Sequence, residues 1–307
     1  MTETAVKTRR RVSRRQGRVR RFNTRDRIVI AVLVGVPSLA MIAFVWGPAL
    51  ASVGLSFFRW NGIGGLDLSS CAASTMSPGA TNGCWYGAQN YVNAGTNYPP
   101  FWGAVRNNVL WLLVFLGFAT PLGMFFALII DSGVKGGRFY QSALFLPVML
   151  SLALIGIIWQ FMYSSNYGFI NSVLGRTSNS TLIDWLGNPQ INFWAVMVEA
   201  SWRQAGYVMI LYLAGLKSVN PALKEAASID GANAWKTFWH VTFPSMRPIN
   251  VVVLIVTVIE ALRAFDLVYI TNRGHNGLEL LSVLITNNIV GEFKRIGFGS
   301  DSSVSRG

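Results

Sequence analysis

The sequence has little charge and few of the side chains that enzymes use. Only 13% of its residues are charged, against about 25% in an ordinary soluble domain, while 52% are hydrophobic. It contains two histidines and two cysteines, and it has no phosphate-binding Gly-x-x-x-x-Gly-Lys-Ser/Thr loop. These shortages argue against a soluble globular domain. They also predict no catalytic site, no metal site and no ATP hydrolysis by this chain.

The hydrophobic residues are gathered in long uncharged runs. An α-helix needs about 20 such residues to cross roughly 30 Å of hydrocarbon. The first run has 31 residues, well beyond the core of a signal peptide at about 7–15 residues, so we expect it to stay as a span. The sequence therefore predicts an all-α polytopic membrane protein with five spans, at residues 28–58, 107–130, 139–162, 193–216 and 249–270.

The positive charge is concentrated ahead of the first span. The formal net charge is +13, and 11 of the 26 Lys and Arg residues lie within residues 7–27. Such an arm can be a nucleic-acid-binding tail or a cytoplasmic anchor. Because this one adjoins a span, we favour the anchor and expect no nucleic-acid partner.

The loops between the spans also differ in charge, in agreement with a cytoplasmic arm. If the arm is cytoplasmic, the connections at 59–106 and 163–192 lie outside, and they are almost uncharged. The other two connections then lie inside and hold Lys135, Arg138, Lys217, Lys224, Lys236 and Arg247. This bias predicts a multi-pass protein of the bacterial inner membrane with a cytoplasmic N-terminus.

Both cysteines, Cys71 and Cys84, fall in the external loop 59–106. The compartment permits a disulfide between them. Two free thiols remain the alternative, because spacing alone does not establish a bond. In either case we expect a structural role.

The segment after the fifth span differs from the rest. It has only 11 uncharged residues in a row, at 280–290, which is too few to span. The chain thus divides into a basic arm (1–27), a membrane domain (28–272) and an external or interfacial segment (273–307). An interfacial or re-entrant helix and the start of a lost sixth span are both consistent with 280–290.

The fourth connection, 218–248, carries the most informative pattern. Pro221 can begin a helix that continues through residues 225–229, and Gly231 can supply a turn with positive φ. A second helix is expected over 234–241, ending before Pro244. The pattern predicts a helix-turn-helix on the cytoplasmic side.

Trp235, Phe238 and Trp239 are unusual in a cytoplasmic loop. Their rings would lose apolar contacts in water, so we expect something to cover them. A partner protein is one interpretation. Packing on neighbouring helices, or a place at the membrane interface where Trp is common, is the other.

This loop resembles the EAA loop of permeases in ATP-binding-cassette importers. The shared residues are Glu225, Ala226, Ala227, Asp230 and Gly231, followed by Phe238 and Phe243-Pro244. Residues 213–269, including Ala-Leu-Arg-Ala-Phe-Asp-Leu-Val-Tyr at 261–269, resemble the maltose and α-glycoside branch. Two features depart from the family: its Thr-Gly-Gly-Gly-Pro is Thr-Asn-Arg-Gly-His at 271–275, and its sixth core helix is absent.

The resemblance implies a type I importer permease fold and a pore-forming subunit that moves a sugar, most simply a di- or oligosaccharide, by alternating access. It implies four kinds of partner besides membrane lipid: a second homologous permease, two copies of a nucleotide-binding ATPase, an external solute-binding protein and the sugar. ATP and Mg would bind the ATPase and not this chain. Glu225, Ala226, Ala227, Asp230 and Gly231 would couple to that ATPase. The alternatives are a secondary transporter, although we find no internal repeat, or a permease for a non-sugar solute such as a phosphorylated polyol.

Several charges lie inside the predicted spans. Glu199 and Arg203 are four residues apart, so they can pair on one helix face. Glu260, Arg263 and Asp266 follow at steps of three. A lone charge at the bilayer centre costs about 2.5–3.5 kcal/mol on insertion scales, so these residues are expected to be paired or to face a polar interior.

A substrate path is one interpretation of these charges. Arg203, Arg263 and Asp266 would bind sugar hydroxyls there, with Trp202 and Tyr207 offering stacking faces. The other interpretation is polar packing against the partner permease. The sequence does not decide between them.

Overall fold

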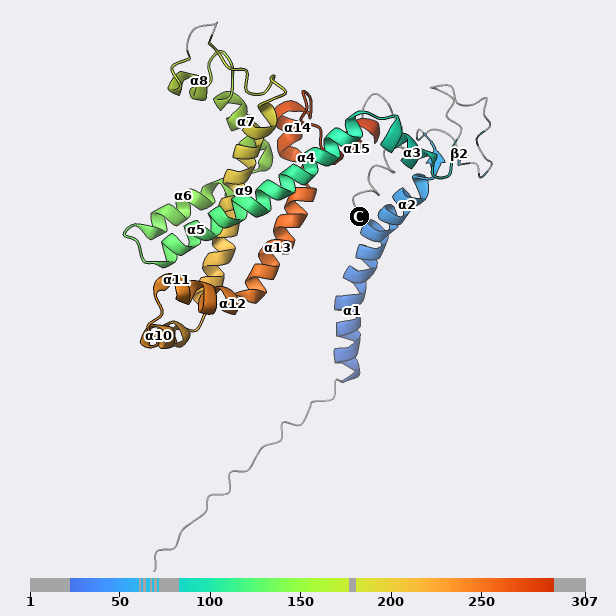
Figure 1. Cartoon of the computed structure of the whole chain (residues 1–307). Coiled ribbons are helices and arrows are strands. Elements are labelled where there is room, and N and C mark those ends of the chain that lie inside the picture. The colour runs from blue at the N-terminus through green and yellow to red at the C-terminus, as the bar shows by residue number, and fades with distance from the viewer. Residues whose placement is uncertain are drawn as a thin grey trace, which may run out of the picture. The chain divides into compact units, whose positions relative to one another are not determined.

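The structure is a computed structural model, shown in Figure 1, that describes residues 23–60, 62, 65–66, 68, 71, 83–176 and 181–289. Most of the predicted basic arm (1–22) and the last residues (290–307) lie outside the described part. The chain divides into two compact units, residues 1–51 and 52–307. Each is described by itself.

The N-terminal helix runs without interruption over 32 residues, Thr24–Leu55. It comprises α1 (Thr24–Met41), a π-helical turn η1 (Ile42–Trp46) and α2 (Gly47–Leu55). Asn23 begins it with a capping box, in which its side chain accepts from the Asp26 N–H and its own N–H donates to the Asp26 side chain at 3.2 Å. The Asn23 side chain also accepts from the Thr24 N–H at 2.7 Å. The π turn ends at Gly47, just before Pro48, which has no N–H to continue the α ladder. The length expected of a first span is confirmed.

The described residues of the second unit form helices and one small antiparallel ladder of two strands. The strands are β1 (Phe58–Arg59) and β2 (Cys84–Trp85). The helices are α3 (Gln89–Thr96), α4 (Pro100–Val114), η3 (Phe115–Ala119), α5 (Thr120–Asp131), α6 (Gly137–Met149), α7 (Leu152–Met162), α8 (Phe169–Val173), α9 (Asn192–Ser218), α10 (Pro221–Ile229), α11 (Ala234–Thr237), η4 (Phe238–Thr242), α12 (Phe243–Ser245), α13 (Arg247–Leu262), α14 (Asp266–Asn272) and α15 (Leu281–Ile289).

Helix α9 is the centre of this unit. Its 27 residues extend about 40 Å, and α5, α6 and α13 all pack along it. The crossing with α5 is close because Gly123 has no side chain: a Cβ there would lie 2.7 Å from the Ala205 carbonyl oxygen and 2.8 Å from the Val208 Cβ. Small residues at helix crossings are typical of membrane bundles, where backbone approach supplies the van der Waals contact.

The prediction of one unbroken helix over 139–162 is wrong. Helices α6 and α7 are bent by 101° at Leu150 and Ser151. Ser151 has an extended backbone and its side chain accepts from the Leu154 N–H at 3.2 Å, so it begins a new helix, and Pro147 weakens the last turn of α6. In the described part of the chain, Thr24–Leu55 and Pro100–Asp131 are each long and apolar enough to cross a membrane, and this bent pair adds a third if it is counted as one span.

The prediction of one unbroken helix over 249–270 is also wrong. Helix α13 ends at Leu262, and α14 begins at Asp266 after a non-helical Phe265. The Ala264 carbonyl at this break accepts the Ser282 hydroxyl, which replaces a helical hydrogen bond. Because the helix is broken here, Asp266 does not follow Glu260 and Arg263 on one helix at the three-residue spacing that the sequence suggested.

Helix α15 lies against α4, where two adjacent asparagines hold it. Asn107 Nδ2 donates to the Gly277 and Glu279 carbonyls, both at 2.9 Å. Asn108 Oδ1 accepts the Leu281 N–H at 3.0 Å and so caps α15. The helix expected within 280–290 is confirmed, and much of its surface is buried.

We expect Asn107→Leu to loosen α15. The substitution removes two part-buried hydrogen bonds to backbone carbonyls, at a cost of about 1–2 kcal/mol. Limited proteolysis of the detergent-solubilised protein should then cleave near residues 275–290 about tenfold faster than in the wild type. Asn97→Leu, at an exposed amide, serves as the control. Equal cleavage of both variants would contradict this role for Asn107.

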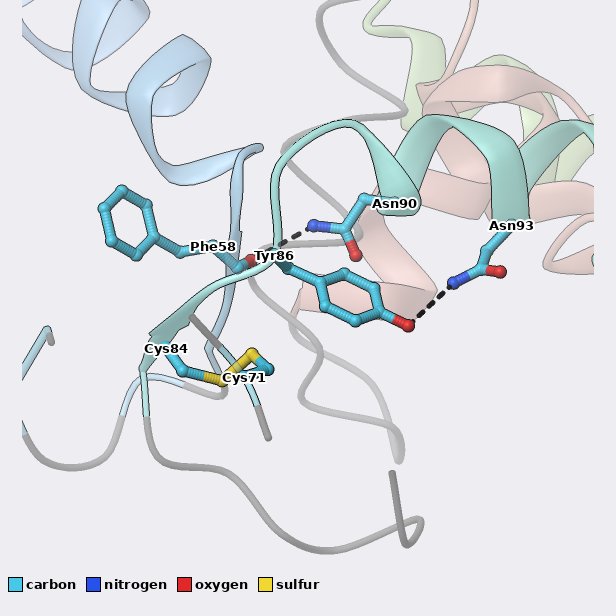
Figure 2. Close-up of a disulfide and its surroundings, with 6 residues drawn as sticks. All are labelled: Phe58, Cys71, Cys84, Tyr86, Asn90 and Asn93. Atoms are coloured by element: carbon cyan, nitrogen blue, oxygen red, sulfur yellow. Dashed lines mark hydrogen bonds between the residues drawn. A yellow bond between two sulfur atoms is a disulfide. The ribbon is translucent and has the colours of Figure 1, made fainter. Parts of the chain in front are cut away.

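The loop after α2 is closed by a disulfide between Cys71 and Cys84, whose Cα atoms are 5.2 Å apart (Figure 2). The Cys71 N–H also donates to the Trp85 carbonyl at 3.2 Å. Asn90 Nδ2 donates to the carbonyls of Ser56, at 2.7 Å, and Phe58, at 3.1 Å. These bonds fasten β1, β2 and α3 to one another.

The unreduced protein should take up no thiol-alkylating reagent, and the reduced protein should take up two equivalents. The 13-residue separation implies a stabilisation of about 3 kcal/mol in the chain-entropy account. Intact-mass measurement after alkylation checks the bond. Labelling of the unreduced protein would show that the two thiols are free.

Candidate functional site

The predicted coupling motif, residues 218–248, forms a compact unit at one end of the bundle (Figure 1, α10 to α12). Helix α10 begins at Pro221, and Asn220 Oδ1 accepts the Ala222 N–H at 3.0 Å. Proline costs nothing at this position because the first helical N–H groups have no partner within the helix. Lys224 Nζ lies 3.5 Å from Asp131 Oδ2 at the end of α5, which ties α10 to the bundle.

Gly231 ends α10 in the manner that the sequence predicted. Its φ is +76°, a conformation that costs L-residues about 1–2 kcal/mol. Its N–H donates to the Ser228 carbonyl at 3.1 Å, and the Ala232 N–H donates to the Ala227 carbonyl at 2.9 Å. This pair of bonds is a Schellman motif, so the glycine fixes the direction in which the chain leaves α10.

The second half of the motif continues further than the sequence predicted. Asn233 caps α11 by accepting the Lys236 N–H at 2.8 Å. The helix does not stop before Pro244 but passes through it to Ser245, so that prediction is wrong. The π turn η4 explains the difference, because the wider turn accommodates a proline that lacks the N–H of the α ladder. Only the bend at Met246 separates this segment from α13.

The predicted coupling residues divide into an outer and an inner set. Glu225, Ala226, Asp230 and Gly231 are exposed, whereas Ala227 is only 8% exposed. The surface that a partner can reach is therefore formed by the outer set, while Ala227 packs inside the motif. Their role in coupling stays a prediction.

The aromatic residues of the motif pack on one another. The Trp239 ring centroid lies 5.7 Å from Trp235, 5.2 Å from Phe238 and 5.2 Å from Phe243. Trp235 nevertheless remains 70% exposed. Mutual packing covers part of this cluster and leaves one face available to a partner or to lipid.

A cavity lies within the bundle, away from the motif. Its volume of about 40 Å³ has room for a few water molecules and not for a sugar ring. Arg203, Arg263 and Asp266, which the sequence singled out, line it. The other lining residues are Trp111, Phe115, Leu152, Ala200, Glu260, Ala264, Phe265 and Leu267.

The charges in the cavity pair between helices. Arg203 Nη1 on α9 lies 3.6 Å from Glu260 Oε2 on α13. The expected Glu199–Arg203 pair within α9 is wrong, because Glu199 is fully buried and instead accepts from Thr271 Oγ1 at 3.3 Å. With a rise of about 1.5 Å and 100° per residue, Glu199 and Arg203 are adjacent on the helix surface. Arg203 nevertheless pairs with Glu260 on α13, and Glu199 is hydrogen-bonded to Thr271 on α14.

Trp202 and Tyr207 do not line the cavity, although the sequence suggested that they would. The Trp202 ring packs against Trp159, with centroids 5.9 Å apart. Trp111 and Phe115 supply aromatic faces to the cavity in their place. In the sequence, nothing distinguishes Trp111 and Phe115 from the other apolar residues of the run at 107–130. Their place in the cavity could be found only from the fold.

Both helices that flank the motif lead to the cavity. Helix α9 enters the motif at Ser218 and carries Arg203, and α13 leaves it at Arg247 and carries Glu260. Helix α13 has 16 residues, about 24 Å. The motif is therefore joined by two helices to the two halves of one ion pair.

Side-chain amides hold the irregular segment that follows the cavity. Gln160 Nε2 donates to the carbonyls of Ile270, at 2.7 Å, and Thr271, at 2.9 Å. Asn192 Nδ2 donates to the Asn276 carbonyl at 2.6 Å. These contacts satisfy backbone groups that no helix pairs, as a membrane interior requires. Isolated amides in apolar runs were the signal that sequence reasoning overlooked.

Comparison with known proteins places this arrangement in a family. Residues 119–290, more than half of the chain, match the binding-protein-dependent transport system inner membrane component. The chain belongs to this family. The resemblance found in the sequence is confirmed, and this permease is a transport subunit and not an enzyme.

Relatives of this permease agree over most of its length. It is 28% identical over 273 residues to the xylose/arabinose import permease protein of Haloferax volcanii, covering 88% of this chain and 81% of the relative. It is 31% identical over 224 residues to the osmoprotective compounds uptake permease protein of Synechocystis, covering 71% and 79%.

A solved structure supports the fold of this permease. It is a bacterial alginate ABC transporter in complex with an alginate pentasaccharide-bound periplasmic protein. The TM-score is 0.72 at 20% identity, and the match covers 92% of this chain and 89% of that chain.

Proposed function

We propose that this permease is the pore-forming subunit of an ATP-driven importer that moves a di- or oligosaccharide across the inner membrane by alternating access. The observation that carries the proposal is that α9 and α13 both join the exposed motif, and that each bears one partner of the Arg203–Glu260 pair in the cavity. A multi-pass topology with five spans and a cytoplasmic N-terminus fits the charge bias.

The partners follow from the family and from this geometry. The exposed face of Glu225, Ala226 and Asp230 would fit a nucleotide-binding ATPase, which binds ATP and Mg itself. A second permease would complete the path, since the cavity of one chain is too small for a sugar. An external solute-binding protein would deliver the sugar, a role supported by the name of the family and by the alginate complex.

In this mechanism, closure of the ATPase pair draws the coupling motifs of the two permeases together. Helices α9 and α13 move with the motif, the Arg203–Glu260 pair separates, and the cavity widens. Arg263 and Asp266 then offer charged hydrogen-bonding groups to sugar hydroxyls, and Trp111 and Phe265 offer apolar faces. Hydrolysis and reopening would restore the ion pair.

A sugar is favoured over other solutes because the cavity holds both charge signs beside aromatic rings, a combination suited to neutral polyhydroxylated molecules. The xylose/arabinose relative agrees with this choice. The second candidate is a non-sugar solute, since one relative takes up osmoprotective compounds and the two arginines could hold a phosphorylated polyol.

Purification of the tagged chain from native membranes tests the proposal. We expect an ATPase with a phosphate-binding loop and a second permease to be recovered with it, and identified by mass spectrometry. Recovery of the chain alone, with solute uptake that follows an ion gradient, would indicate a secondary transporter instead.

A further inference from the structure

A second cavity lies at the end of the bundle opposite the coupling motif, where Figure 1 shows α7 and α8. Its volume is about 320 Å³, within the range of small-molecule sites. Side chains of α7, α8 and α9 line it, among them Trp159, Phe169, Val173 and Val198. It shares no lining residue with the cavity of Arg203.

The walls of this second cavity are apolar. Three of its lining residues carry an N–H or O–H group: the Tyr163 hydroxyl donates to the Ala195 carbonyl at 2.8 Å, and the Trp185 indole N–H donates to Asn171 Oδ1 at 3.1 Å. The Trp159 indole N–H is buried and has no partner among the described residues. A sugar would find poor hydrogen bonding here, whereas a hydrocarbon chain would fit.

The rim of the cavity is also apolar where it is exposed. Phe169 is 63% exposed, Val173 68% and Val198 56%. Exposed apolar surface of this kind marks contact with lipid or protein. Because the chain belongs to an inner-membrane family, lipid is the apolar partner that this surface fits most simply.

One positive charge, Arg176, lies two residues along the chain from the lining residue Leu174. Arg176 is the only Lys or Arg between Arg138 and Arg203 in the sequence. Its backbone N–H donates to the Asn171 carbonyl at 2.9 Å, so it is fixed at the end of α8, three residues beyond Val173. Its guanidinium, which has five N–H donors, bonds the Thr181 carbonyl at 3.1 Å. Arginine beside an apolar mouth suits a phosphate.

We propose that this cavity binds an acyl chain of an anionic phospholipid, whose phosphate pairs with Arg176. The site lies apart from the proposed sugar path and goes beyond the proposed transport function. Such a lipid would fill the space between α7, α8 and α9. A helix of the second permease, or a loop of the binding protein, would exclude lipid from the same space.

Tryptophan quenching by brominated lipid tests the site in the complete complex. The complex is reconstituted in nanodiscs of phosphatidylglycerol or phosphatidylcholine with brominated acyl chains, and the Trp185 signal is taken as the difference between wild type and Trp185→Phe. We expect at least twofold stronger quenching of Trp185 in phosphatidylglycerol. Val198→Phe, which fills the cavity, should abolish this quenching.

Arg176→Gln tests the headgroup contact at an exposed position. It should remove the preference for phosphatidylglycerol, while Lys135→Gln, in the exposed turn between α5 and α6, should preserve it. If Val198→Phe fails to assemble, Val173→Phe at the exposed rim replaces it. Absence of Trp185 quenching in the wild type would show that protein covers the cavity, and unchanged quenching in the filled variants would place the lipid elsewhere. Either result overturns the proposal.

Discussion

Replacing Gly231 by valine should reduce the amount of ATPase recovered with the tagged permease by about tenfold. The glycine has a φ of +76°, and no atom lies within 4 Å of the position that a Cβ would occupy. The effect therefore arises from backbone strain and not from a clash. A β-branched residue is strongly disfavoured at positive φ, by about 1–2 kcal/mol or more, which is enough to redirect the chain at the end of α10.

Gly133→Val is the matched control. Gly133 has a φ of +79° and the same open surroundings, but it lies in the turn between α5 and α6. We expect this variant to lose a similar amount of local stability and to retain most of the ATPase. If the two variants lose the ATPase equally, the loss comes from general destabilisation, and the α10 cap has no specific role in docking.

Reversing the charge of Arg203 should abolish transport while the complex still assembles. In Arg203→Glu, two carboxylates face each other where the present contact is 3.6 Å. At an effective dielectric constant of about 20, a pair of charges at this distance interacts by about 4 kcal/mol, so we expect uptake to fall at least a hundredfold. The ATPase should still be recovered, because the coupling motif begins beyond Ser218, about 22 Å along α9 from Arg203.

The double variant Arg203→Glu with Glu260→Arg restores opposite charges at the same two positions. We expect it to recover uptake at least tenfold over the single variant. Uptake and substrate-stimulated ATP hydrolysis, both measured in proteoliposomes, separate transport from coupling. A double variant no better than the single one would show that the pair does not link α9 to α13.

The sequence was most informative where one local pattern decides the structure. Pro221 and Gly231 predict the start and the end of α10 because caps and turns depend on neighbouring residues. Long apolar runs likewise predict the helices Thr24–Leu55 and Pro100–Asp131. The sequence favoured the Cys71–Cys84 bond, but only the fold established it, because spacing left two free thiols as an alternative.

The breaks within helices were missed because their cause is tertiary. The helix breaks at Ala264 and Phe265, where the Ser282 hydroxyl donates to the Ala264 carbonyl. Further along the chain, the amides of Gln160 and Asn107 donate to the carbonyls of Ile270 and Glu279. None of these donors is near in sequence to the carbonyl that it bonds. The hydrophobic pattern alone therefore predicted that the helix would continue. The Arg203–Glu260 pair was missed for the same reason. Sequence spacing favoured Glu199 as the partner of Arg203, whereas the packing of α13 on α9 brings Glu260 next to it.

Solute uptake into proteoliposomes that contain the purified complex tests the central claim most directly. We expect labelled oligosaccharide to accumulate only when ATP is enclosed with the ATPase and the binding protein is present on the opposite side. Accumulation that needs no ATP and follows an imposed ion gradient would contradict the account.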